Sequence, residues 1–292
     1  MALISSKPLG TLIRVADSDG GSGAANYEIA DINNLVPGGV VLVRKNIYSN
    51  STFGSTTAYP NGTLDNLINT TIYNKMPQQL RDKMMDVSFN LNGSGDITRK
   101  MFALTYTMAG FGNNSGTAEG KALQLYKSNA SRIKTLNGSA AGWWLSSRGS
   151  SGRAWGVGSG GSSLSFSPSY SYGVVPAFAI PQSVMLEDSA NTDGSYSIKY
   201  TEKIACTVNM GSAEERPKAA LPIISCNGNL TLKICNNAND ASPAWETAAN
   251  ETVHNFANTA KTAAKWAIGL EIEITRTAGE NLFLNEPIVL TM

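Results

Sequence analysis

The sequence predicts an α+β domain followed by a smaller all-β sandwich. In the first half, segments with apolar residues at helical spacing are flanked on both sides by β-branched segments. They do not alternate with strands as in parallel α/β folds. From about Leu186 onward, short apolar segments separated by frequent turn residues replace the helical spacing, a pattern typical of β-sandwiches.

The first half holds the predicted helices and their flanking strands. Thr63 is a candidate N-cap before apolar residues at helical spacing, namely Leu64, Leu67, Ile68 and Ile72. Three further short helices are predicted at 77–87, 117–126 and 128–136. The segments rich in β-branched or other bulky apolar residues predict strands at 11–15, 38–48 and 100–106.

The polar segment 187–197 predicts a linker, which places the two domains at 1–186 and 198–292. In the second domain, "LEIEIT" and "NLTLKI" alternate apolar and polar residues, as strands with one face in a core do. The strand candidates of this domain are 196–210, 218–226, 229–237, 265–278 and 285–292.

Composition argues against several classes of protein. A net charge of +1 gives no indication of binding to nucleic acid. The first residues do not form a signal peptide, and no apolar run is long enough to span a membrane, so we expect no membrane insertion. Three cysteines, Cys206, Cys226 and Cys235, cannot all pair and lack zinc-site spacing, so we expect reduced thiols. No cofactor or metal is expected.

Catalytic motifs are also weak. The single histidine, His254, lies in a polar stretch, where a surface role is the preferred interpretation. The segment 17–23, "DSDGGSG", has the start of a calcium loop but lacks its distal glutamate, so a turn is the better interpretation. For the alternative of a glycan hydrolase, the candidate carboxylates are Asp82, Asp86 and Asp96, whose spacing favours surface positions instead.

The segment 146–172 contains eleven serines and six glycines, together with arginine, tryptophan, phenylalanine and tyrosine. A flexible linker does not need the aromatic residues, whereas binding loops combine tyrosine and tryptophan with serine and glycine in this way. The segment therefore predicts a contact surface. Its candidate ligand-binding residues are Arg148, Ser150, Ser151, Arg153, Trp155, Ser159, Ser162, Ser169, Tyr170 and Tyr172.

Residues 163–172 within this segment alternate serine with larger residues, which predicts a strand. Leu164 and Phe166 are expected to face the core, and Pro168 interrupts the strand. Adjacent residues of a strand point to opposite faces, so we expect only one of Trp143 and Trp144 to be buried.

The stretch "GWWLSSRGSSGRAWGVGSGG…YGVVPAFAIP", with "VLVRKNIY", "TLDNLINTTIYNKMPQQLRDKM" and "ASRIKTLNG" upstream, resembles a domain family of phages and prophages of Gram-positive gut bacteria. Its pattern is roughly "GWWLRSP…AWYV…GVRPAL", and the resemblance covers about 10–182. It implies a C-type-lectin-like fold. In members targeted by diversity-generating retroelements, the segment between "WWL" and "RPA" is the mutagenised one. The family arginines after "WWL" and in "GVRPA" are replaced here by Ser147 and Val175, so no role is carried over for them.

The second half carries "LKICNNANDASPAWETAA" and "NFANTAKTAAKWAIGLEIEITR", which resemble a terminal module of phage tail and baseplate proteins. This resemblance implies an immunoglobulin-like β-sandwich in a virion protein.

Together these patterns predict a non-enzymatic bacteriophage virion protein that presents a binding surface, with tail-fibre or baseplate attachment to the host as the preferred function. A capsid decoration protein is the alternative within the virion. The expected partners are other virion proteins, a glycan or protein receptor on the host cell, and further copies of the chain. The expected location is the virion, assembled in the host cytoplasm and exposed outside the cell.

Overall fold

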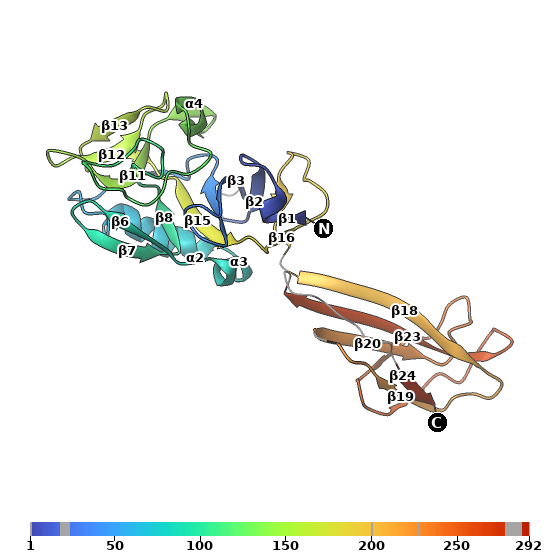
Figure 1. Ribbon diagram of the computed structural model, residues 1–292. Coiled ribbons are helices and arrows are strands. Elements are labelled where there is room, and N and C mark those ends of the chain that lie inside the picture. Colours follow the sequence, from blue (N-terminus) through green and yellow to red (C-terminus); the bar gives the residue numbers. More distant parts are fainter. Residues whose placement is uncertain (1, 18–23, 200, 227, 278–287, 292) are drawn as a thin grey trace. The chain divides into compact units, whose positions relative to one another are not determined.

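The computed structural model describes residues 2–17, 24–199, 201–226, 228–277 and 288–291. The chain forms two compact units, Met1–Lys199 and Tyr200–Met292 (Figure 1). It is mostly β, with 42% strand against 10% helix.

The first unit contains most of the secondary structure elements. Its strands are β1 (Ala2–Leu3), β2 (Leu12–Val15), β3 (Ala25–Ile32), β4 (Gly39–Arg44), β5 (Asn50–Thr52), β6 (Val87–Leu91), β7 (Gly95–Arg99), β8 (Met101–Ala103), β9 (Lys134–Leu136), β10 (Ser139–Ala141), β11 (Trp143–Arg148), β12 (Ala154–Val157), β13 (Ser163–Phe166), β14 (Ser171–Gly173), β15 (Pro176–Pro181), β16 (Met185–Leu186) and β17 (Tyr196–Ser197). Its helices are α1 (Thr63–Asn66), α2 (Tyr73–Lys75), α3 (Gln78–Lys83) and α4 (Asn129–Arg132); a π-helical segment, Leu67–Ile72, joins α1 to α2, and a 3-10 turn, Ile4–Ser6, follows β1.

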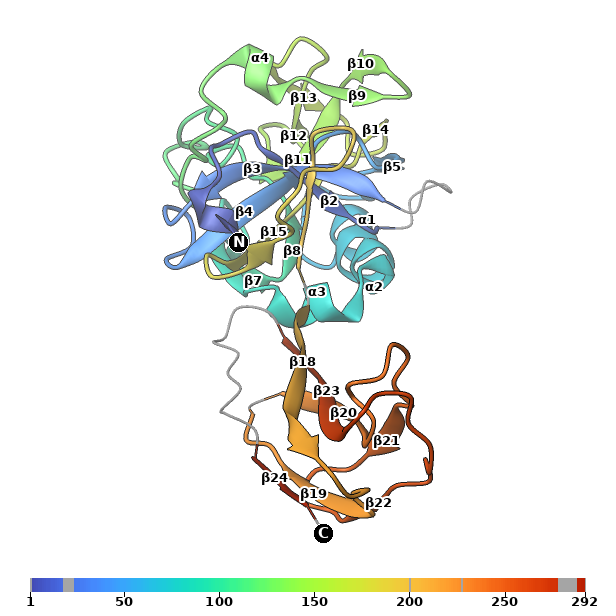
Figure 2. The ribbon, with the colours of Figure 1, turned by 90° about the vertical axis from the view of Figure 1, so that its right-hand side faces the viewer.

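A six-stranded sheet forms the centre of the first unit, in the order β17-β2-β3-β4-β15-β8, with only β17 and β2 running parallel. Every residue of β4 is buried, so this sheet is covered on both faces. The π-helical segment contacts β8, and α1 and α2 lie beside the sheet in Figure 2. The predicted helix is confirmed, and its apolar residues Leu64, Ile68 and Ile72 are buried. Thr63 is not its N-cap as predicted, because Gly62 takes that position and Thr63 is the first helical residue.

A second sheet carries the serine-rich segment, in the order β13-β12-β11-β14-β5. Trp143 and Trp144 are adjacent in β11, and both are 0% exposed. The expectation that only one of them is buried is wrong, because β11 has protein on both of its faces. The ring of Trp144 packs against Phe53, while the indole of Trp143 donates to the carbonyl of Arg132 at 3.0 Å.

Two of the predicted helices do not form as expected. Residues 117–126 are irregular because Gly116 and Gly120 both have φ of +85°, outside the helical region. Within 128–136 only α4 is helical, with Ser128 as its N-cap, and β9 follows directly. Glycine thus prevents the first of these helices, whereas the second ends at Ile133, whose backbone is already extended.

The residues predicted as a linker, 187–197, fold onto the first unit. Strand β17 pairs with β2, and the amide of Glu187 donates to the carbonyl of Ser197 at 3.0 Å. The side chain of Asp193 accepts from Asn26 at 3.0 Å. These contacts correct the linker prediction, because the division between the compact units falls after Lys199.

The second unit consists of two antiparallel sheets, β18-β23-β20-β21 and β22-β19-β24. The prediction of alternating strands is confirmed, because Leu270, Ile272 and Ile274 are all buried in one core while the glutamates between them are only partly buried. The strand bounds are β18 (Thr201–Ala213), β19 (Ala219–Ile223), β20 (Asn229–Cys235), β21 (Glu246–Ala248), β22 (His254–Asn255), β23 (Trp266–Thr277) and β24 (Ile288–Thr291).

Candidate functional site

The ten candidate ligand-binding residues lie on the strands and turns of the five-stranded sheet. Eight of them are exposed, and Trp155 and Tyr172 are half-buried. Tyr170 has 56% of its surface exposed, a large fraction for an aromatic residue. The exposed residues are Arg148, Ser150, Ser151, Arg153, Ser159, Ser162, Ser169 and Tyr170.

Strand pairing brings six of these residues to one end of the sheet. Ala154 at the start of β12 lies opposite Phe166 at the end of β13, so the 149–153 loop and the 167–170 turn emerge side by side. Arg153 Nη1 donates to the carbonyl of Ser165 at 3.2 Å and thereby joins the two segments. We call this set the hairpin surface; it consists of Arg148, Ser150, Ser151, Arg153, Ser169 and Tyr170.

Ser159 and Ser162 are not part of the hairpin surface. They lie in the connection from β12 to β13, at the opposite end of these strands. Gly161 in this connection approaches α4 so closely that an added Cβ atom would lie 2.0 Å from the carbonyl oxygen of Asn129. The structure therefore divides the predicted site into two separate places.

The turns of the serine-rich segment are fixed by backbone hydrogen bonds. In the 149–153 loop, the amide of Gly149 donates to the carbonyl of Arg153 at 2.8 Å. Ser151 has φ of 54° and Gly152 has φ of 71°, the left-handed conformations that tight hairpin turns require. These residues therefore build defined turns. Defined turns are expected of a contact surface and are not expected of a flexible linker.

Aromatic side chains support the sheet on one face. The ring centroids of Phe166 and Tyr172 are 3.9 Å apart, and Trp144 contacts both rings. Gly156 makes room for this packing, since an added Cβ atom would lie 3.0 Å from the Phe166 ring. Phe166 thus packs inward as predicted, whereas Leu164 is 45% exposed and its predicted core position is wrong.

A buried polar network lies beneath the hairpin surface, with Glu119 at its centre. Glu119 is 0% exposed and accepts hydrogen bonds from the amide of Asn92 at 2.9 Å, from Asn114 Nδ2 at 3.1 Å and from the Ser147 hydroxyl. A buried carboxylate needs several such donors. Ser147, at which the resembled family has arginine, therefore contributes to this network as a buried hydrogen-bond donor.

Asn114 links this network to the hairpin surface. Its Nδ2 atom donates to the carbonyl of Arg148 at 2.8 Å, and its Oδ1 atom accepts from the indole of Trp155 at 3.1 Å. The ring of Trp155 also packs against Tyr106 at a centroid distance of 4.7 Å. Trp155 is consequently held by the protein on two sides, and Arg148 is fixed at its backbone.

Sequence reasoning missed Asn92, Asn114 and Glu119. The sequence does contain one indication of this region. Four glycines from Gly110 to Gly120 disfavour a helix and predict an irregular segment. An irregular buried segment needs side-chain partners for its backbone groups, and these polar residues supply them.

The structure gives little support to the alternative of a glycan hydrolase. Asp82, Asp86 and Asp96 are all exposed, and Asp96 accepts from Asn90 at 2.9 Å as an ordinary surface residue. His254 contacts Glu246 at 2.9 Å in the second unit. Within the described ranges, no three His, Cys, Asp or Glu residues are grouped to hold a metal ion.

Residues 18–23 of the suggested calcium loop lie outside the described residues. Asp17, which precedes them, is buried and pairs with Arg44 at 2.8 Å.

A family model described as a domain of unknown function, DUF6273, matches residues 37–182, half of the chain. The chain belongs to the DUF6273 family. The DUF6273 match runs from just before β4 to just after β15, so it contains the hairpin surface and the Glu119 network. Searches of curated proteins and of solved structures found no match. Among the described residues of this DUF6273 protein, no helix is long and apolar enough to cross a membrane.

Proposed function

We propose that this chain is a non-enzymatic virion protein of a bacteriophage of Gram-positive hosts, and that its hairpin surface attaches the virion to a receptor on the host cell. In this proposal the first unit is a C-type-lectin-like domain and the second is an immunoglobulin-like sandwich. The receptor is a glycan or a protein of the cell surface.

The observation that carries the proposal is the contrast between the hairpin surface and its support. Arg148, Arg153 and Tyr170 are exposed side chains of the types that dominate binding hot spots. They extend from a sheet whose strand β11 is buried on both faces and whose loop is fixed by Asn114. A rigid support beneath adaptable serine and glycine turns is the arrangement that lowers the entropic cost of binding.

The second unit supports a role in assembly. Its two sheets enclose one core that includes Leu232, Ile234 and Leu270, so this unit has a hydrophobic centre of its own. A domain with its own core can serve as a docking module to other virion proteins or to further copies of the chain. The resemblance to tail and baseplate modules favours this role.

Attachment of the full-length chain to cells tests the proposal. We expect the fluorescently labelled protein to bind at least one strain in a panel of Gram-positive bacteria, measured by flow cytometry. The triple variant R148A/R153A/Y170A should lose at least tenfold in bound signal. Because all three side chains are exposed, its thermal midpoint should fall by no more than about 3 °C.

A charge-matched control separates specific contact from general attraction. Lys121 and Lys127 are exposed lysines of the same unit, and K121A/K127A removes as many positive charges as the triple variant. This control should bind like the unmodified chain. If the triple variant folds and binds normally, the hairpin surface is not the attachment site and capsid decoration becomes the better function. A collapsed midpoint, or no binding to any strain, also contradicts the proposal.

A further inference from the structure

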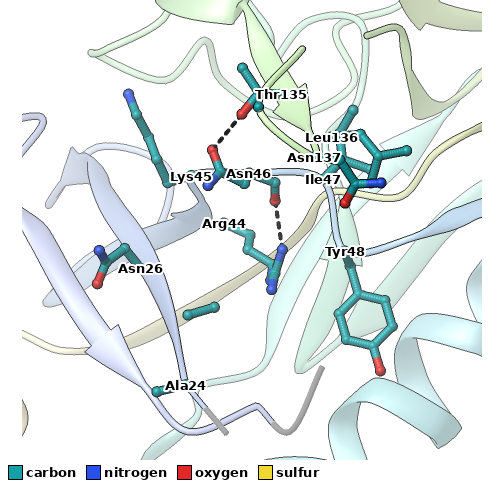
Figure 3. Close-up of a pocket in the computed structure, with 12 residues that line it drawn as sticks. Ala24, Asn26, Arg44, Lys45, Asn46, Ile47, Tyr48, Thr135, Leu136 and Asn137 are labelled. Atoms are coloured by element: carbon teal, nitrogen blue, oxygen red, sulfur yellow. Dashed lines mark hydrogen bonds between the residues drawn. The ribbon is translucent and has the colours of Figure 1, made fainter. Parts of the chain in front are cut away.

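A second concave site lies in the first unit, apart from the ten candidate residues. It is a cavity of about 490 Å³, which is within the range of small-molecule sites. Three segments line it: residues 24–26 at the start of β3, residues 44–48 after β4, and residues 135–138 of the β9–β10 hairpin (Figure 3). None of the hairpin-surface residues contributes to its wall.

Hydrogen bonds hold the three segments together. The amide of Lys45 donates to the carbonyl of Asn26 at 2.8 Å, and the amide of Ile47 donates to the carbonyl of Thr135 at 2.9 Å. The hydroxyl of Thr135 donates to Oδ1 of Asn46 at 2.9 Å, as Figure 3 shows. These bonds fix the wall of the cavity before any ligand binds, which is the condition for a preformed site.

The β9–β10 hairpin closes one side of the cavity with a tight turn. Asn137 and Gly138 have φ of 51° and 83°, the positive values of a two-residue hairpin loop for which Asn-Gly is the favoured sequence. Asn137 is exposed and lines the cavity. Its amide therefore faces solvent at a defined place and is available for hydrogen bonding to a ligand.

Among the described residues around this cavity, positive charge exceeds negative charge. Glu28 is shared by two ammonium groups, because Lys45 contacts its Oε2 atom at 3.0 Å and the buried Lys134 contacts its Oε1 atom. Burial raises the pKa of Glu28, but the attraction of Lys134 and then Lys45 outweighs it and lowers this pKa below its usual value. One carboxylate thus faces two cations, which leaves one positive charge uncompensated.

A second uncompensated cation lies beside the lining residue Tyr48 and is not itself part of the cavity wall. Lys75 donates to the hydroxyl of Tyr48 at 2.7 Å, and within the described part of the chain no carboxylate pairs with it. Arg44, by contrast, pairs with the buried Asp17 at 2.8 Å and donates to the carbonyl of Asn46 at 2.9 Å. The nearby Asp193 faces Arg14 at 3.7 Å, so it adds no net negative charge. The cavity is consequently suited to an anion.

The rest of the lining indicates a ligand rich in hydroxyl groups. Asn26, Asn46, Thr135 and Asn137 supply amide and hydroxyl groups, and Tyr48 supplies a half-buried aromatic ring. Asparagine amides both donate and accept, which matches hydroxyl groups that do the same. We propose that this cavity binds an anionic saccharide, a sugar carrying a carboxylate or a phosphate, through Lys45, Lys75 and the asparagine amides.

Binding of defined small molecules to the full-length chain tests this proposal without any reference to cell attachment. The probes are a panel of hexuronic acids and hexose 6-phosphates, the corresponding neutral hexoses, and inorganic phosphate alone, each titrated by calorimetry. We expect at least one anionic sugar to bind at least tenfold more tightly than its neutral counterpart. The affinity should fall as salt is added, because screening weakens charge attraction. Which class binds distinguishes recognition of a carboxylate from recognition of a phosphate.

The variants K45Q and K75Q locate the site. Each should weaken binding of the anionic sugar by about tenfold, the loss expected for one charge-assisted hydrogen bond. The variant K127Q removes an exposed lysine that does not line the cavity, and it should leave the affinity unchanged. The proposal is overturned if no anionic sugar binds, if neutral sugars bind as well, if inorganic phosphate binds as tightly as the sugar, or if both K45Q and K75Q retain full affinity.

Discussion

Removing either tryptophan of β11 should destabilise the first unit strongly. Trp143 and Trp144 are both 0% exposed, although they are adjacent and point to opposite faces of the strand. Each indole also donates one hydrogen bond, from Trp143 to the carbonyl of Arg132 at 3.0 Å and from Trp144 to the carbonyl of Ser51 at 2.8 Å. W143A and W144A therefore each create a cavity and leave a carbonyl without its donor.

The size of this effect follows from the burial. Replacing a buried tryptophan by alanine costs about 3–5 kcal/mol in the free energy of unfolding. For a unit of this size, each kcal/mol lowers the thermal midpoint by about 2–4 °C, so each variant should lose about 6–20 °C. The phenylalanine variants W143F and W144F keep much of the apolar volume and should lose about 1–3 kcal/mol, mainly the lost hydrogen bond.

Differential scanning calorimetry of the full-length chain measures these shifts. L164A is the matched control, because Leu164 belongs to the same sheet but is 45% exposed and should change the midpoint by less than about 2 °C. The reasoning fails if either W143A or W144A behaves like this control, since the corresponding face of β11 would then be open to solvent.

Three other perturbations test separate parts of the structure. G161A should destabilise the first unit far more than G152A. Both glycines have positive φ, but only at Gly161 would the new Cβ atom clash with backbone, at 2.0 Å from the carbonyl oxygen of Asn129. Urea denaturation of the two variants compares their stabilities, and equal losses would contradict the prediction. E119A should cost about 3 kcal/mol or more in unfolding free energy, because it removes the acceptor shared by the buried Ser147 hydroxyl, the Asn114 amide and the partly buried Asn92 backbone amide. A loss below about 1 kcal/mol would show that water reaches these donors. Alkali should unfold the chain, because three buried tyrosines, Tyr27, Tyr59 and Tyr126, have pKa values raised above 10. Burial is the main cause for each, and the nearby carboxylate (Asp17, Asp65 and Glu28 in the same order) is the second. Above pH 10 the unfolded chain therefore loses phenolic protons that the folded chain keeps. Burial lowers the pKa of Lys134 to about 8, so this lysine makes the free energy of unfolding rise with pH between pH 8 and 10.5. Above pH 10.5 the tyrosines should dominate, and the free energy of unfolding should fall with a limiting slope of about 4 kcal/mol per pH unit for three tyrosines. Urea unfolding series at pH 9 and 11 check this, and equal stability at the two values would refute it.

Periodicity in the sequence predicted those elements whose two faces differ. Leu270, Ile272 and Ile274 alternate with glutamates because one face of β23 meets the core of the second unit. Likewise Leu64 and Ile68 keep helical spacing because one side of that segment packs inward. In both cases the local spacing of apolar residues is enough to predict which side is buried, because one side of the element faces the core along its whole length.

The errors arise where distant segments decide burial. Nothing in the sequence next to Trp143 and Trp144 indicates that protein covers both faces of β11, because the covering residues, such as Phe53 and Arg132, lie elsewhere in the chain. Leu164 follows a strict alternation and is nevertheless exposed, since β13 is the edge strand of its sheet. The exposure of the serine-rich turns was predictable from composition, whereas the Glu119 network and the cavity beside Lys45 depend on contacts between remote segments.

The turns of the hairpin surface are exposed, whereas strand β11 beneath them is buried, and this difference affects which substitutions the protein can tolerate during evolution. Substitutions at exposed positions such as Ser150 and Ser169 each alter unfolding free energy by about 0.5 kcal/mol or less. Even several at once remain small against the 5–15 kcal/mol that stabilises an ordinary domain. Residues that would contact a partner are thus free to vary while Trp143, Trp144 and Glu119 keep the frame unchanged. A lineage carrying this domain can therefore accumulate substitutions in these turns without first having to regain a stable fold.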